Sequence, residues 1–124
     1  MERTRFIHHA GKTILMLDYS GLGSSDEQLQ EEIARTKAVI AKEPPGSVLT
    51  LTDVRGSRIT PGNVRAMGDL VRHNAPYVKW SAVVVGLTGV YLTAFRAIQA
   101  VSRRRNLRSF GDLDEAKDWL VSQP

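Results

Sequence analysis

An unbroken run of small and β-branched apolar residues constrains the fold of this chain more than any other feature. It lies in the stretch from Ser81 to Gly89, Ser-Ala-Val-Val-Val-Gly-Leu-Thr-Gly, and ends at Gly86. An apolar run without alternation is typical of a strand buried on both faces, and such strands lie at the centre of mostly parallel sheets covered by helices. We therefore expect an α/β fold with residues 78–85 as its central strand.

The rest of the chain supplies the neighbouring strands and the covering helices. Gly11 predicts a tight turn between two antiparallel strands, and Thr60 followed by Pro61 predicts the start of a helix. The expected strands are residues 4–9, 13–18, 47–53, 78–85 and 107–110, and the expected helices begin near residues 25, 60, 88 and 112. The order ββαβαβαβα predicts a single domain over residues 1–124, with a mixed, mostly parallel five-stranded sheet flanked by four helices.

The composition excludes several classes of protein. The 124 residues include no cysteine, which rules out disulfides, cysteine zinc sites and thiol nucleophiles and fits a reducing compartment. No stretch approaches the roughly 20 apolar residues of a membrane span, and no apolar signal core follows the charged start. We expect a cytoplasmic protein.

The net charge of +4 comes from a local cluster of arginines. Without the four that the cluster contains, the remaining 13 basic residues balance the 13 acidic ones. The cluster consists of Arg103, Arg104, Arg105 and Arg108. Such a basic edge can hold an acidic partner, a small anion, lipid head groups or nucleic-acid phosphates. The local charge argues against a broad nucleic-acid surface, and no aromatic residue lies between the arginines to stack on bases. The alternative is a solvated helix end with a favourable dipole interaction.

Three loops are expected at the carboxyl ends of parallel strands, where α/β folds usually bind ligands. They are residues 19–24, 53–60 and 86–89. In the last of these, Gly86, Thr88 and Gly89 can offer backbone N–H groups to a ligand or partner. Alternatively, the glycines only allow a sharp turn from strand to helix.

The loop after the third strand contains an acid and two hydroxyl groups. Asp53 ends the strand, and Ser57 or Thr60 would be a phospho-acceptor near the start of the second helix. The alternative assigns Thr60 to helix capping and Ser57 to a solvated loop. An enzymatic role would require Asp18 or Asp53 to be buried beside a basic partner in a cleft.

No motif indicates a metal or a cofactor. His8 and His9 are adjacent on a strand and therefore point to opposite faces, so they cannot chelate one ion together. The chain has no Gly-x-Ser-x-Gly elbow, and its loop of residues 86–89 lacks the lysine of a phosphate-binding loop. We expect no cofactor and no catalytic residues.

Several motifs together resemble the SpoIIAA-like group of STAS domains, which includes uncharacterised bacterial and archaeal proteins. The resemblance spans nearly the whole chain. It is carried by the Gly11-Lys12 hairpin, the strand ending at Asp53, His-Asn-Ala-Pro-Tyr-Val-Lys at 73–79, Ala-Val-Val-Val-Gly-Leu-Thr-Gly at 82–89, and Phe-Gly-Asp-Leu-Asp-Glu-Ala-Lys-Asp-Trp-Leu at 110–120.

The resemblance implies a small regulatory domain without enzymatic activity. Relatives include anti-sigma-factor antagonists that bind partner kinases and carry a phosphorylatable serine at the start of the helix after the third strand. Ser57 is the nearest serine here, but the usual acid-serine pair is not reproduced, because Asp53 is followed by Val54 and Arg55.

Two functional hypotheses follow. The first is a regulatory or protein-interaction domain that binds an unidentified protein partner through the three loops. The second is a small-molecule or lipid-binding module, because Tyr91, Phe95 and Ile98 form an apolar stripe that leads to the arginine cluster. A pocket of about 300 Å³ or more would favour the second. Residues 5–9 are an edge strand that can pair with a second copy.

Overall fold

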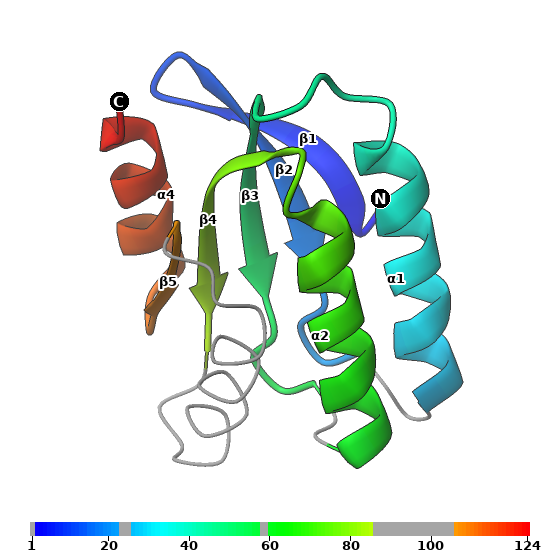
Figure 1. The fold of residues 1–124 in the computed structure, drawn as a ribbon. Helices are drawn as coiled ribbons and strands as arrows, with labels where there is room; N and C mark the ends of the chain where they lie inside the picture. The colour runs from blue at the N-terminus through cyan, green and yellow to red at the C-terminus, as the bar shows by residue number, and fades with distance from the viewer. Residues whose placement is uncertain (1, 23–25, 58–59, 86–105) are drawn as a thin grey trace.

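A computed structural model describes residues 2–22, 26–57, 60–85 and 106–124 of the chain. After an initial hairpin, the described strands and helices alternate as far as β4, and β5 and α4 are the last two described elements (Figure 1). In chain order they are β1 (Thr4–His9), β2 (Lys12–Asp18), α1 (Asp26–Ile40), β3 (Val48–Asp53), α2 (Pro61–Asn74), β4 (Val78–Val84), β5 (Leu107–Phe110) and α4 (Leu113–Ser122).

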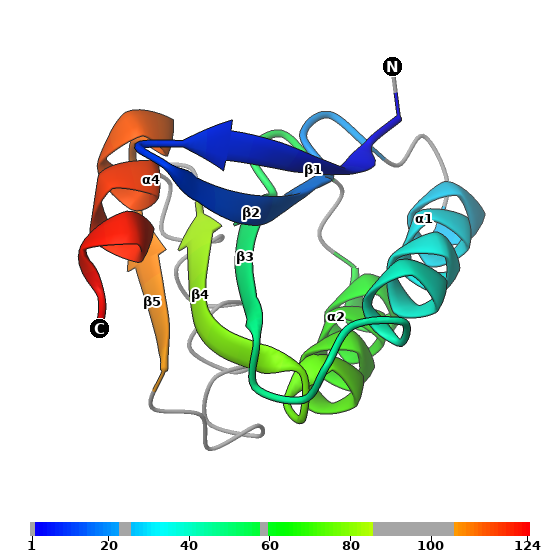
Figure 2. The same ribbon diagram turned by 90° about the horizontal axis from the view of Figure 1, so that it is seen from above.

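The five strands form one mixed sheet in the order β1-β2-β3-β4-β5. β1 is antiparallel to β2, and every other neighbouring pair is parallel. α1 and α2 lie on one face of the sheet and α4 lies on the other (Figure 2). The α/β class and the mixed five-stranded sheet are therefore confirmed.

The prediction that residues 78–85 form the central strand is only partly correct. β4 lies inside the sheet between β3 and β5, but the middle strand is β3. β3 contains threonines that alternate with apolar residues, so its hydropathy predicts a less buried strand than β4. Thr50 is nevertheless buried, because its hydroxyl donates to the Ser81 hydroxyl at 2.7 Å. Paired hydroxyl groups allow a polar strand to occupy the most covered position.

Three of the four predicted helices are described. Thr60 caps α2 and Asp112 caps α4, in both cases by accepting a hydrogen bond from the backbone N–H three residues later, as predicted. The helix predicted from residue 88 lies outside the described residues. So do Gly86, Thr88, Gly89, Arg103, Arg104 and Arg105.

The core has two layers because successive residues of a strand point to opposite faces. On β2, Leu15 and Leu17 pack towards α1 and α2, while Ile14 and Met16 pack towards α4. All four side chains are almost fully buried. Burying each contributes about 1.5–3 kcal/mol relative to exposure, so β2 joins both layers.

A buried polar network connects the hairpin to α1. The Thr4 hydroxyl donates to the Glu32 carboxylate at 2.8 Å, and the Thr36 hydroxyl donates to the Glu32 backbone carbonyl at 3.1 Å. The Tyr19 hydroxyl lies 2.5 Å from the Thr36 hydroxyl. The Thr36 hydroxyl also lies 2.8 Å from the Thr4 hydroxyl, so Thr4, Tyr19, Glu32 and Thr36 form one connected network. Burial raises the pKa of the Tyr19 phenol far above its ordinary 10.0, and the nearby negative charge of Glu32 adds to the effect.

This network predicts a loss of stability at alkaline pH. The unfolded chain releases the Tyr19 proton above about pH 10 whereas the folded chain keeps it, so the contribution is complete below that pH and declines above it. The decline is about 1.4 kcal/mol per pH unit. Urea unfolding at several pH values should show this component in the wild type and not in Tyr19→Phe. Tyr77→Phe lies outside the network and should keep the same decline in the free energy of unfolding. Equal pH dependence of this free energy in the wild type and in Tyr19→Phe would contradict the prediction.

Candidate functional site

The carboxyl ends of β2 and β3 form a rim where two aspartates lie side by side. Asp18 and Asp53 are register partners on these parallel strands. Backbone hydrogen bonds hold the loops after the two strands together, from Tyr19 N to Asp53 O and from Gly21 N to Arg55 O, both at 2.9 Å. β2, β3 and β4 are parallel, as predicted, so their carboxyl ends lie at the same edge of the sheet.

Asp53 is buried and bound by the arginine two residues later. Its side chain is 5% exposed, and Arg55 donates to both carboxylate oxygens, from Nε at 3.0 Å and from Nη2 at 2.9 Å. The Arg55 backbone N–H also donates to Asp53, at 3.1 Å. Hydrogen bonding to Asp53 raises the pKa of the Arg55 guanidinium, and the negative charges of Asp112 and Asp18 add to the effect. The guanidinium is 43% exposed and therefore combines a fixed inner side with an accessible outer side.

Asp18 fixes the loop after β2. Its carboxylate accepts hydrogen bonds from the Ser20 backbone N–H at 3.1 Å and from the Ser20 hydroxyl at 2.5 Å. Arg3 donates to the backbone carbonyls of Asp18 and Ser20, and its Nη1 lies 3.9 Å from the Asp18 carboxylate. The Arg3 side chain is 39% exposed, which places a second guanidinium at the rim.

The two predicted phospho-acceptors have different environments. Ser57 is buried, and its hydroxyl donates to the Val54 carbonyl at 2.7 Å. Thr60 is the N-cap of α2, accepts from Asn63 N at 3.0 Å, and lies 3.1 Å from the nearer carboxylate oxygen of Asp26. A kinase would have to break a hydrogen bond to reach either hydroxyl, and at Thr60 the phosphate would lie close to a carboxylate.

Asp26 at the start of α1 is a rim residue that the sequence analysis missed. An acidic residue in the first turn of a helix is expected to interact with the N-terminus of that helix, yet the Asp26 carboxylate contacts Thr60 at the start of α2. Its space there depends on Gly62, where a Cβ atom would lie 3.0 Å from Asp26 Oδ2. The glycine at the second helical position was the only signal of this contact in the sequence.

We expect opposite effects of alanine at the two glycines of α2. Gly→Ala in a helix usually stabilises by about 0.5–1 kcal/mol. Gly68→Ala should do so because, among the described residues, its Cβ would meet only Arg72 Nη1, at 3.8 Å. Gly62→Ala should lose this gain or destabilise. Urea unfolding measures both variants. In an Asp26→Ala background Gly62→Ala should regain the normal helical benefit, and the same ΔΔG with and without Asp26 would contradict the contact.

Arg108 is the only residue of the arginine cluster within the described part of the chain. It is exposed on β5, with its guanidinium carbon 5.2 Å from the centre of the Phe110 ring and 5.9 Å from that of Trp119. This arrangement is a cation–π contact, in which the positive charge of Arg108 interacts with two aromatic side chains of the protein itself.

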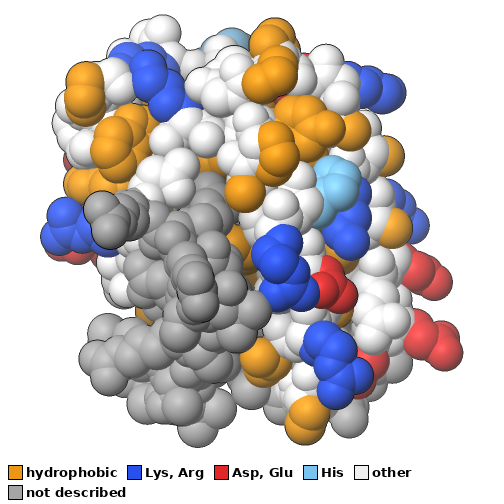
Figure 3. All heavy atoms as spheres, viewed as in Figure 1, with side chains coloured by type: hydrophobic (Ala, Val, Ile, Leu, Met, Phe, Trp, Pro, Cys, Tyr) orange, Lys and Arg blue, Asp and Glu red, His pale blue; other side chains and the backbone are white. Residues whose placement is uncertain are grey.

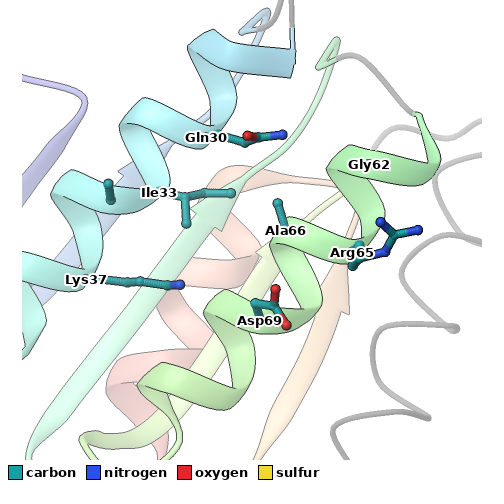
Figure 4. Close-up of a pocket in the computed structure, with 8 residues that line it drawn as sticks. Gln30, Ile33, Lys37, Gly62, Arg65, Ala66 and Asp69 are labelled. Atoms are coloured by element: carbon teal, nitrogen blue, oxygen red, sulfur yellow. The ribbon is translucent and has the colours of Figure 1, made fainter.

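An open groove of about 340 Å³ lies between α1 and α2. Ala34 on α1 and Ala66 on α2 leave space between the helices, and Ile33 forms an apolar wall. Lys37 extends towards α2, where Asp69 lies on the opposite wall (Figure 4). Neither Asp18 nor Asp53 lines this groove. The surface over α1 and α2 carries charged side chains of both signs (Figure 3).

The described histidines have partners of their own. His8 Nδ1 lies 3.2 Å from the Thr13 hydroxyl, and His9 Nε2 lies 2.8 Å from the Asp118 carboxylate. Within residues 2–22, 26–57, 60–85 and 106–124 there is no group of three side chains that could hold a metal ion. Across the same described ranges, no helix has the length and apolar character needed to cross a membrane.

Comparison with family models, curated proteins and solved structures finds no significant match to this chain.

Proposed function

We propose that this protein is a non-catalytic regulatory domain that binds a protein partner through the rim formed by the ends of β2 and β3 and the start of α2. One observation carries the proposal. The rim carboxylates and hydroxyls of Asp18, Asp53, Ser57 and Thr60 are all hydrogen-bonded inside the protein, whereas the guanidinium groups of Arg3 and Arg55 are about two-fifths exposed.

This arrangement favours recognition over chemistry. A general acid or base must be within hydrogen-bonding reach of its substrate, and Asp53 directs both of its oxygens to Arg55. Asp53 is buried beside a basic partner, which was half of the condition for an enzymatic role, but the described groove lies elsewhere. A guanidinium held by a buried carboxylate is already ordered, so it loses little conformational entropy when it binds a partner. The partner we propose has an acidic surface.

The resemblance to STAS domains adds a switch to this proposal, of the anti-sigma-factor-antagonist type. Phosphate on Ser57 or Thr60 would bring negative charge to the basic rim and weaken the binding of an acidic partner. At Thr60 the phosphate would also repel Asp26, which holds the start of α1 against the start of α2. Both effects would release the partner by electrostatic repulsion.

Affinity capture from an extract of the source organism tests the binding surface. The wild type should retain a stoichiometric protein partner that Arg3→Ala/Arg55→Ala loses. Lys12→Ala/Lys79→Ala is the matched control, because it removes the same charge from exposed residues at the opposite ends of β2 and β4. The control should retain the partner.

Arg55→Ala leaves a buried carboxylate without its partner, so circular dichroism must show that the rim variant is folded. Arg55→Lys provides a second variant that keeps the charge and loses the two-pronged hydrogen bond. No retained protein, or equal retention by the folded rim variant, would refute the proposal. Incubating the captured complex with ATP and mapping phosphate to Ser57 or Thr60 examines the switch separately.

The groove between α1 and α2 supports a second candidate function, a small-molecule or lipid-binding module. Its volume of about 340 Å³ falls at the lower end of the range for ligand sites. Lys37 would bind an anionic group, and Ile33, Ala34 and Ala66 would contact an apolar body.

Native mass spectrometry of protein purified from the source organism should then detect a bound ligand. Ala66→Leu, which fills the groove, should remove it, and Ala75→Leu, at an exposed position just after α2, should not. Spectra of the wild type without added mass would exclude this candidate.

A further inference from the structure

β1 forms an outer margin of the sheet (Figure 2). Among the described residues it pairs only with β2, and this register is uninterrupted from Thr4↔Leu17 to His9↔Lys12. It contains no proline and no bulge, two of the devices by which proteins prevent edge strands from pairing. The outer edge of β1 is therefore straight enough to accept another strand.

An apolar side chain is exposed in the middle of this edge strand. Phe6 is 44% exposed, whereas its neighbour Ile7 packs against the core layer beneath α4. Thr4 bonds to Glu32 on α1, so the alternation of the strand places Thr4, Phe6 and His8 on the α1 face. A strand added along β1 would cover the Phe6 ring.

We propose that β1 pairs with β1 of a second copy, antiparallel and about a two-fold axis at Phe6. Opposite residues in an antiparallel pair point to the same face of the sheet. A two-fold axis between the copies must therefore place even-numbered residues opposite even-numbered ones and odd-numbered residues opposite odd-numbered ones. With the axis at Phe6, the two Phe6 rings meet. Arg5 then lies opposite Ile7 of the other copy, and Thr4 lies opposite His8.

Between Thr4 and His8, this register brings no two basic side chains directly opposite each other. An axis at Arg5 would oppose two arginines, and an axis at Ile7 would oppose Arg5 and His9. Like charges directly opposite are destabilising in a sheet. At each end of the pair, Arg3 lies opposite His9 of the other copy, and each of these groups has an acidic partner in its own subunit, Arg3 with Asp18 and His9 with Asp118. Among the axes at Arg5, Phe6 and Ile7, the charge pattern therefore favours the one at Phe6. That axis places the exposed apolar ring against an identical ring, which favours a second copy as the occupant.

The pairing would join two sheets of five strands into one continuous sheet. The two-fold axis is perpendicular to the sheet, so it keeps α1 and α2 of both copies on the same face and reverses the direction of the strands. The two rims would therefore lie at opposite edges of the dimer, and each would remain open to a partner.

Single cysteines test the register, since the natural chain contains none. Phe6→Cys places two thiols directly opposite, within about 5 Å between Cβ atoms, so mild oxidation should give a covalent dimer. His8→Cys is the matched control on the same face of the same strand. Its two copies would lie four residues apart, about 13 Å, and should give at least tenfold less covalent dimer.

Sedimentation tests the association without cysteines. With rising concentration, the wild type should approach twice the monomer mass of 13.7 kDa. Phe6→Lys opposes two ammonium groups and should remain a monomer, whereas His8→Lys faces Thr4 and should still dimerise. Phe6 is exposed, so both variants should fold. A monomeric wild type, a dimeric Phe6→Lys, or equal cross-linking of His8→Cys and Phe6→Cys would overturn the proposal.

Discussion

Parallel pairing of β2, β3 and β4 is the constraint on which the rest of the structure depends. The crossovers from β2 to β3 and from β3 to β4 run through α1 and α2, which both cover one face, while α4 follows β5 and covers the other. Parallel strands also end at the same edge. The aspartates that end β2 and β3 are therefore brought together, although 35 positions separate Asp18 from Asp53.

At this edge the protein uses its charged residues mainly to fix its own loops. Arg55 holds the buried carboxylate of Asp53, Asp18 holds Ser20, and Asp26 reaches across to Thr60 at the start of α2. Burying a charge is costly unless it is paired and hydrogen-bonded, so these contacts must form together with the fold. Among the described residues of this edge, Arg3 and Arg55 keep the outer sides of their guanidinium groups accessible, which suits binding to an acidic surface.

The sequence predicted the elements well because their signals are local. The strand bounds of residues 4–9 and 107–110 and the caps at Thr60 and Asp112 are confirmed, since turns, caps and β-branched runs act over a few residues. The middle position of the sheet was predicted wrongly, because Thr50 owes its burial to Ser81, which lies on another strand. The role of Asp26 was missed for the same reason: its partner is 34 positions away.

The sequence alone therefore determined the α/β class, the order of the described elements, and the edge at which Asp18 and Asp53 meet. Periodicity, capping and the direction of parallel strands are sufficient for these. Only the tertiary structure decided which charged groups form hydrogen bonds within the protein and which are exposed to solvent. That distinction depends on distances between side chains of different elements, such as Asp26 and Gly62, and no local pattern encodes such distances.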